Sequence, residues 1–176
     1  MCIAAPSLAV MRSTLPLLLL AILAASPVAA QDLQWRFRTS PGHSHLAFAA
    51  DGSDVGDLWL ECRDASSRVS LKFPVEHRIG FELHGTTYVD ADGRPEPWPV
   101  RVTVESGSKR ATLGGEAHYD ESRDGSFISV SFPMGGPILA SFARTGQLTA
   151  TAFGETPDIP PAPQELVSQF LDACRP

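Results

Sequence analysis

Alternation of apolar and polar residues is the dominant pattern of this chain, and it predicts many short β-strands. Residues 67–73 show it clearly, because Val69, Leu71 and Phe73 alternate with polar residues, as in a strand that buries one face. Similar short segments, bounded by turn residues, occur at 34–38, 44–50, 58–62, 79–83, 86–89, 100–105, 110–113, 116–119, 127–132 and 147–153. We therefore predict an antiparallel meander.

Helical spacing follows near the C-terminus. Pro137 suits the first turn of a helix, and Gly146 fits the left-handed position after its end. A terminal helix is indicated by apolar residues at helical spacing: Leu166, Val167, Phe170, Leu171 and Cys174. The order predicts a mainly β (α+β) fold, an antiparallel β-sandwich or barrel closed by a C-terminal strand, a short helix and the terminal helix. Gly114 and Gly115 are expected to form a turn between two strands.

Residues 1–30 predict a secretory signal peptide. Arg12 precedes an apolar core over residues 15–25, and small residues before Gln31 suit a signal peptidase. We expect residues 31–176 to form a single β-rich domain, whose size is usual for one core. An uncleaved membrane anchor is the weaker interpretation, because the apolar run is shorter than the roughly 20 residues that a bilayer core requires.

The cysteines also fit export. Cys2 would leave with the signal, so Cys62 and Cys174 would be the pair in the mature chain. An even number of cysteines in an oxidising compartment predicts a disulfide, which would staple the terminal helix onto a central strand. Reactive paired thiols are disfavoured, since the close CxxC spacing is absent. Because arginine outnumbers lysine, as in proteins of GC-rich bacteria, we expect the periplasm rather than the extracellular medium.

Charge narrows the possible partners. The whole chain has 14 Lys and Arg against 20 Asp and Glu, and removal of Arg12 with the signal changes the net charge from −6 to −7. Nucleic acids and anionic membranes are usually met by clustered basic surfaces, so both are disfavoured. We expect no stable membrane insertion after signal cleavage.

A pair of histidines is the most suggestive chemical feature. His43 and His45 are alternate residues of one predicted strand, so they point to the same face and could share a metal ion. A third ligand would come from His118, His84 or Asp51. The alternative is that both histidines are simply solvated next to a turn, and we expect no cofactor.

Other motifs give no reaction. Two acidic runs, at residues 51–57 and 120–124, match no calcium-binding pattern and are expected to be solvated loops. The chain has no G-x-S-x-G nucleophile motif and no phosphate-binding loop. The sequence therefore predicts no catalytic residue.

Two tryptophans are candidates for different roles. Trp59 lies between Leu58 and Leu60, which favours core packing over ligand stacking. Trp98 lies between Pro97 and Pro99, and prolines are confined to strand edges or bulges. We therefore expect Trp98 to be exposed at the rim of the sheet and to act as a binding residue. The alternative is that Trp98 folds inward and caps the core.

The order of these parts resembles a known group of proteins. Cys62 followed by Arg63, the later Trp98, the passage 142–148 and a final helix ending in cysteine are similar to small bacterial periplasmic proteins associated with type VI secretion. The polar run 120–129 departs from that family's Trp and Ser-Thr-Asp stretch. The resemblance implies an envelope accessory protein and no catalytic residues.

These observations leave two functional hypotheses. The preferred one is an exported, periplasmic, non-enzymatic binding or accessory protein that recognises another envelope or secretion-system protein. The alternative is a metal-dependent hydrolase or metal-binding protein that uses His43 and His45. Fold class alone does not separate them, because function depends on local sites.

Overall fold

The computed structural model describes residues 32–51, 56–63 and 66–175. The predicted signal, residues 1–30, lies outside the described residues, and residues 31–176 form one compact unit. The described part has these elements: β1 (Gln34–Ser40), β2 (His43–Ala49), β3 (Gly56–Arg63), β4 (Arg68–Val75), β5 (Gly80–His84), β6 (Thr87–Asp90), β7 (Trp98–Ser106), β8 (Lys109–Asp120), β9 (Gly125–Pro133), α1 (Pro137–Thr145), β10 (Thr149–Thr151) and α2 (Gln164–Ala173).

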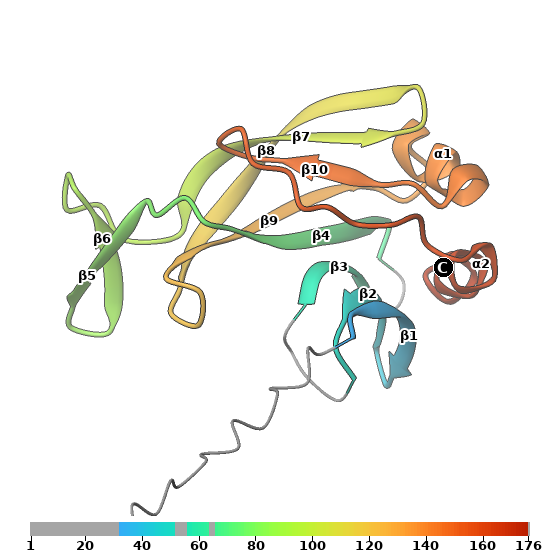
Figure 1. The fold of residues 1–176 in the computed structure, drawn as a ribbon, viewed down its shortest axis with the longest axis horizontal. Helices are drawn as coiled ribbons and strands as arrows, with labels where there is room; N and C mark the ends of the chain where they lie inside the picture. Colours follow the sequence, from blue (N-terminus) through green and yellow to red (C-terminus); the bar gives the residue numbers. More distant parts are fainter. Residues whose placement is uncertain (1–31, 52–55, 64–65, 176) are drawn as a thin grey trace, which may run out of the picture. The chain divides into compact units, whose positions relative to one another are not determined.

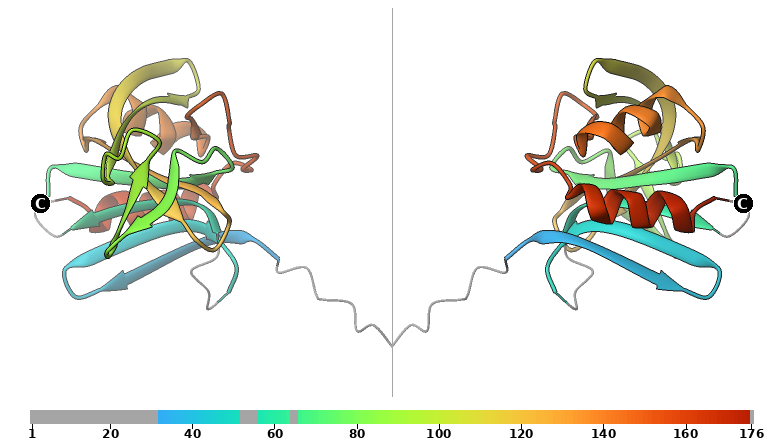
Figure 2. Two further views of the ribbon diagram at one scale, coloured as in Figure 1. Left: turned by 90° about the vertical axis from the view of Figure 1, so that its left-hand side faces the viewer. Right: turned by 90° about the vertical axis from the view of Figure 1, so that its right-hand side faces the viewer.

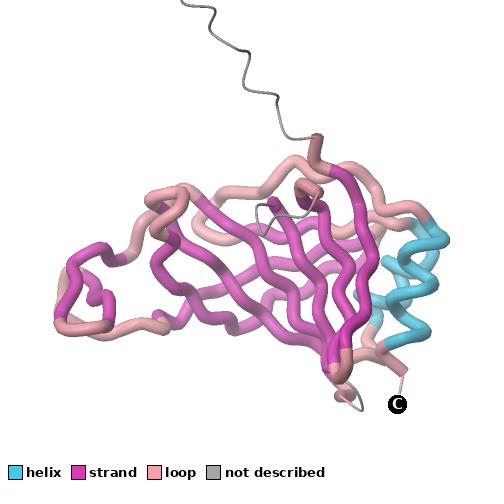
Figure 3. Tube along the Cα trace, turned by 90° about the horizontal axis from the view of Figure 1, so that it is seen from below, coloured by secondary structure: helices cyan, strands magenta, loops and turns pink. Residues whose placement is uncertain are grey.

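One antiparallel sheet dominates the domain. Its eight strands follow the order β1-β2-β3-β4-β9-β8-β7-β10, while β5 and β6 form a separate two-stranded hairpin. The large sheet curls into a half-barrel, which is visible along the strands in Figure 3. The hairpin and the two helices lie at opposite ends of this domain (Figure 1). The predicted mainly β fold, with its C-terminal strand and helices, is therefore confirmed.

Strand alternation places the core on the inner face of the sheet. In β4, Val69, Leu71 and Phe73 are fully buried, as the period of two predicts. The helices complete this core: α1 packs on β7 and β8, α2 packs on β1 and β2, and the helices contact each other. The helices therefore join the two sides of the half-barrel at one end, which faces the viewer in the right-hand view of Figure 2.

Local sequence sets the ends of α1. Pro137 occupies the first turn, where its missing N–H has no helical partner to lose. Gly146 ends the helix with φ 65°, and its N–H donates to the carbonyl of Phe142. Ala162 donates in turn to the carbonyl of Gly146 at 2.8 Å, so the incoming C-terminal connector is tied to the end of α1.

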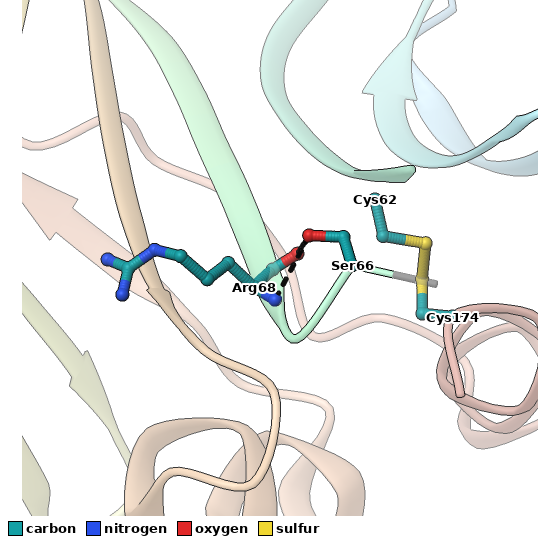
Figure 4. Close-up of a disulfide and its surroundings, with 4 residues drawn as sticks. All are labelled: Cys62, Ser66, Arg68 and Cys174. Carbon is teal, nitrogen blue, oxygen red and sulfur yellow. Dashed lines mark hydrogen bonds between the residues drawn. A yellow bond between two sulfur atoms is a disulfide. The ribbon is translucent and has the colours of Figure 1, made fainter. Parts of the chain in front are cut away.

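The disulfide is confirmed. Cys62 at the end of β3 is bonded to Cys174 at the end of α2, with Cα atoms 5.7 Å apart (Figure 4). In the same view the Ser66 hydroxyl is hydrogen-bonded to the backbone of Arg68, the first residue of β4, whose side chain extends away from the disulfide. The connector before α2 is also fixed to the sheet, because the Trp35 indole Nε1 donates to the carbonyl of Pro160 at 2.8 Å.

One predicted turn is wrong. Residues 110–113 and 116–119 do not form two strands, because β8 runs without interruption through Gly114 and Gly115. A Cβ atom on Gly115 would lie 2.6 Å from the carbonyl oxygen of Ser129 and 3.0 Å from a methyl carbon of Val102. Glycine therefore serves close packing of neighbouring strands here rather than a change of chain direction.

None of the described helices is long and apolar enough to cross a membrane.

Candidate functional site

The two histidines share a face of β2, as predicted. The rings of His43 and His45 lie nearly parallel, with centroids 6.2 Å apart and planes 16° apart. His45 Nδ1 lies 3.5 Å from a carboxylate oxygen of Glu61 on the adjacent strand. Over the described residues, however, no group of three or more His, Cys, Asp or Glu side chains is placed to hold a metal ion.

The three suggested third ligands have other neighbours. His84 lies 3.2 Å from Glu82 within β5. His118 Nδ1 lies 3.5 Å from Glu96, and Asp51 pairs with Arg36 at 2.9 Å. The sequence thus indicated the shared face, but the fold does not bring the expected third ligand to it. Metal binding by His43 and His45 stays a prediction.

The predicted exposure of Trp98 is wrong. Its side chain is only 3% exposed and belongs to the core, and its Nε1 donates to the carbonyl of Arg94 at 2.9 Å. The reason is strand alternation: Trp98 begins β7 and shares the inner face with Val100 and Val102, while Pro99 points outward. The flanking prolines indicated a strand end correctly, but the indole points inward. Trp98 is therefore not the exposed anchor that we expected, and a binding role for it stays a prediction.

Trp59 takes an intermediate position. Leu58 and Leu60 point into the core, so Trp59 lies on the outer face of β3, where it is half-buried. Its ring packs against Phe127. The expected core packing is thus replaced by packing on the outer face of the sheet.

The acidic runs form ion pairs instead of being only solvated, and Asp57 lies in β3 rather than in a loop. Asp124 accepts a hydrogen bond from the Tyr119 hydroxyl at 2.7 Å and pairs with Arg78. Asp57 pairs with Arg123 at 3.1 Å, so the two acidic runs each bind a distant part of the chain. Asp54 lies outside the described residues.

Exposed apolar side chains gather near the hairpin end. Within the residues described here, three large apolar side chains are exposed: Phe81 is 62% exposed, Leu83 54% and Phe153 43%. We call these three residues the hairpin surface. Phe81 and Leu83 lie on β5, which projects from the large sheet together with β6 (Figure 1). Neither strand belongs to the large sheet. The outer edge of β6 is bridged to residues 94–96, whereas the outer edge of β5 has no strand partner among the described residues.

A set of contacts connects Phe81 to Phe153. The guanidinium carbon of Arg78 lies 4.9 Å from the centroid of the Phe81 ring. Arg78 also lines a cleft of about 490 Å³, together with Ile79, Trp98 and Phe153. At the rim of this cleft the Phe153 ring stacks on His77 with centroids 4.1 Å apart.

Phe153 adopts an unusual backbone conformation. Its φ is 52° and that of Gly154 is 84°, and Ala152 and Glu155 exchange backbone hydrogen bonds across them. Two positive φ angles are the pattern of a type I′ turn, which favours Asn-Gly. A phenylalanine in this position costs on the order of 1–2 kcal/mol. Such strain at an exposed ring is typical of a functional position.

Polar contacts hold the hairpin on the sheet. The Tyr88 hydroxyl donates to Glu121, and the rings of Tyr88 and Tyr119 are 4.5 Å apart. The backbone N–H of Glu96 donates to the carbonyl of Tyr88 at 3.0 Å, and its carboxylate accepts from the N–H of Tyr119 at the same distance. β6 is thus tied to β8 and to the loop after it, so the exposed side chains are held in place before any partner arrives.

The hydroxyl contacts also change the acidity of the tyrosines. The hydrogen bond to Glu121, reinforced by partial burial and the nearby negative charge, raises the pKa of Tyr88 to about 12. The hydrogen bond to Asp124 is the main cause that raises the pKa of Tyr119. Both phenols therefore stay protonated, and able to donate, well above neutral pH.

The sequence carried partial signals of this surface. The alternation of Ile79, Phe81 and Leu83 was visible, but it predicted a strand with a buried face. Phe153 followed by Gly154 carried the glycine of a turn, but it fell within a predicted strand. Neither signal showed that this apolar face would be left uncovered.

Comparison of the chain with protein-family models, with curated proteins and with solved structures gave no match. The resemblance to periplasmic proteins associated with type VI secretion therefore stays a prediction, and the functional argument depends on the surface itself.

Proposed function

We propose that this protein is an exported, non-enzymatic binding or accessory protein, which recognises another protein of the bacterial envelope through the hairpin surface. The observation that carries the proposal is the exposure of Phe81, Leu83 and Phe153 at one end of a well-packed domain. Isolated exposed apolar residues are common on proteins. Phe153 lines a cleft and has a strained backbone, and Arg78 of the same cleft lies over the Phe81 ring, so the three exposed side chains are typical of a contact surface rather than isolated residues.

The hairpin is suited to bind a protein partner. Its polar contacts with the body fix the two strands, so little conformational entropy is lost when a partner docks. The outer edge of β5 can also accept a strand from the partner, since an extended segment supplies the missing backbone hydrogen bonds. Aromatic side chains at the centre of such a contact commonly carry much of the binding free energy.

Export to the periplasm is part of the proposal. It is supported by the disulfide, since such bonds persist in oxidising compartments and are rare in the cytosol. A component of a secretion system would be a partner of the expected class.

Photo-cross-linking in intact cells tests this proposal. A photoreactive phenylalanine analogue replaces Phe81, and a matched protein carries it at Gln169, an exposed position of α2. We expect a discrete cross-linked product of higher mass in the envelope fraction from position 81 and none from position 169. Absence of a product at position 81, or equal products at both positions, would contradict the proposed function.

A further inference from the structure

A second cleft, of about 600 Å³, is lined by residues of three strands and one loop. Trp59 of β3, His118 of β8 and Phe127 of β9 form part of its wall, and the loop 120–123 completes it. None of these residues belongs to the hairpin surface. The cleft therefore needs its own explanation.

Two aromatic rings give the cleft its apolar part. The rings of Trp59 and Phe127 have centroids 5.4 Å apart and planes inclined by 56°. The indole also lies against the start of β3, because a Cβ atom on Gly56 would be 2.9 Å from a ring carbon of Trp59. Because Gly56 has no side chain, the Trp59 ring can pack against the start of β3 on the outer face of the sheet.

Two carboxylates of the loop have only neutral donors. Asp120 accepts from the backbone N–H of Ser122 at 3.0 Å and from its hydroxyl at 2.6 Å. Glu121 accepts from the Tyr88 hydroxyl. Among the described residues, no Lys, Arg or His lies within 4.0 Å of either carboxylate.

The arginine of the same loop does not supply the missing charge. Arg123 lies 3.1 Å from Asp57 and donates to the carbonyl of Gly56 at 2.6 Å. Its charge is thus directed to another carboxylate. The cleft combines two aromatic rings with two carboxylates that form no ion pair with the described residues, within a chain whose net charge is already negative.

We propose that this cleft binds a lysine or arginine side chain from a basic segment of a partner protein. A cation gains from the face of an indole or phenyl ring, and a nearby carboxylate adds a charge-assisted hydrogen bond. The acidic balance of the chain would also attract a basic segment over a longer range. A neutral ligand would use the rings and could donate hydrogen bonds to the carboxylates, but it would not neutralise their two charges. The inference extends the proposed function, because it specifies the chemistry of a second contact.

Titration with a hexa-arginine peptide tests this inference. Trp35 and Trp98 are buried, at 9% and 3% exposure, so the half-buried Trp59 is the tryptophan best placed to report binding by fluorescence. We expect saturable quenching by hexa-arginine that weakens as salt is added, and none by hexa-glutamate. The protein is purified from the periplasm, and circular dichroism verifies that each variant is folded.

A pair of matched double variants separates local from general electrostatics. Asp120→Asn with Glu121→Gln keeps the side-chain oxygens that accept hydrogen bonds from Ser122 and Tyr88, but removes both charges from the cleft. Asp158→Asn with Glu165→Gln removes the same charge from exposed positions elsewhere. We expect the Kd for hexa-arginine to rise about 10-fold or more in the first variant and less than about 2-fold in the second.

Three outcomes would overturn the inference. They are an absence of binding to hexa-arginine, equal weakening in the two double variants, and preferential binding of a neutral oligosaccharide such as chitotriose. Photo-cross-linking at position 81 is performed with both carboxylates intact, so its result is separate from that of the titration. Failure of this titration with successful cross-linking would remove the cationic contact and leave the proposed function in place.

Discussion

The two ends of the domain use their apolar side chains in opposite ways. At the helical end, Phe142 and Phe170 are fully buried, and the disulfide joins α2 to β3. At the hairpin end, Phe81 and Leu83 are more than half exposed, although β6 itself is attached to the body by polar contacts and by the packing of Tyr88 and Val89. Both ends belong to one compact unit, so the different exposure of their apolar side chains depends on local packing and not on the amino-acid composition of the chain.

This difference indicates how stability and recognition are divided. Burial of apolar area stabilises the fold, so side chains left in water contribute little to the unassociated protein. Exposed phenylalanines that are held in position are instead available to a partner. Substitutions at the helical end and in the core should therefore reduce stability, whereas substitutions on the hairpin surface should reduce binding.

The largest effect is expected for Trp98→Ala. Loss of this buried indole should lower the free energy of unfolding by about 3–5 kcal/mol, because it removes apolar contacts and leaves a cavity. Urea denaturation followed by circular dichroism measures it. A change below about 1 kcal/mol would show that Trp98 is not a core residue.

The disulfide should have the next largest effect. Replacing both Cys62 and Cys174 by alanine should lower the free energy of unfolding by about 2–5 kcal/mol, since the bond closes a long loop with a sequence separation of 112. Comparison with the oxidised parent in urea gives the difference. If the two proteins had equal free energies of unfolding, the disulfide would contribute nothing to the stability of the helical end.

Phe153→Asn should change stability in the opposite direction. Asparagine accepts a positive φ more readily than phenylalanine, so the turn should gain about 1 kcal/mol. Thermal unfolding provides the test, with Phe153→Leu as a control that keeps an apolar side chain. The account would be contradicted if the asparagine variant were less stable than the parent. The stacking of Phe153 on His77 would then stabilise the fold by more than the backbone strain at Phe153 destabilises it.

The tyrosine contacts predict a spectroscopic effect. The folded pKa of Tyr88 is raised to about 12, so any stability linked to it is present below pH 10 and is lost as the pH rises toward 12. Absorbance of tyrosinate should therefore appear at higher pH in the native protein than in urea. Glu121→Gln should move the titration of Tyr88 back toward 10, and an unchanged titration would contradict the role of this hydrogen bond.

Much of the fold was predictable because its signals are local. In a strand that buries one face, such as β4, apolar residues occur at every second position. In α2, which packs on the core, Val167 and Phe170 lie on the buried side of the helix. The pairing of Cys62 with Cys174 followed from the number of cysteines and the expected compartment. These inferences needed no knowledge of strand order.

The site was harder to predict because it depends on the arrangement of distant strands. Trp59 and Phe127 belong to strands on either side of β4 in the sheet, an order that the sequence does not reveal. Alternation in residues 79–83 likewise could not show that β5 leaves the large sheet. At Trp98 two local signals disagreed, and strand alternation prevailed over the flanking prolines.

The most direct test of the division between the two ends is urea denaturation of the double variant Phe81→Ser, Leu83→Ser. Because both side chains are more than half exposed, the free energy of unfolding should stay within about 0.5 kcal/mol of that of the parent. The hairpin surface would then be free of any role in stability and available to a partner. A loss of more than about 2 kcal/mol would contradict the account, because it would show that these residues stabilise the fold itself.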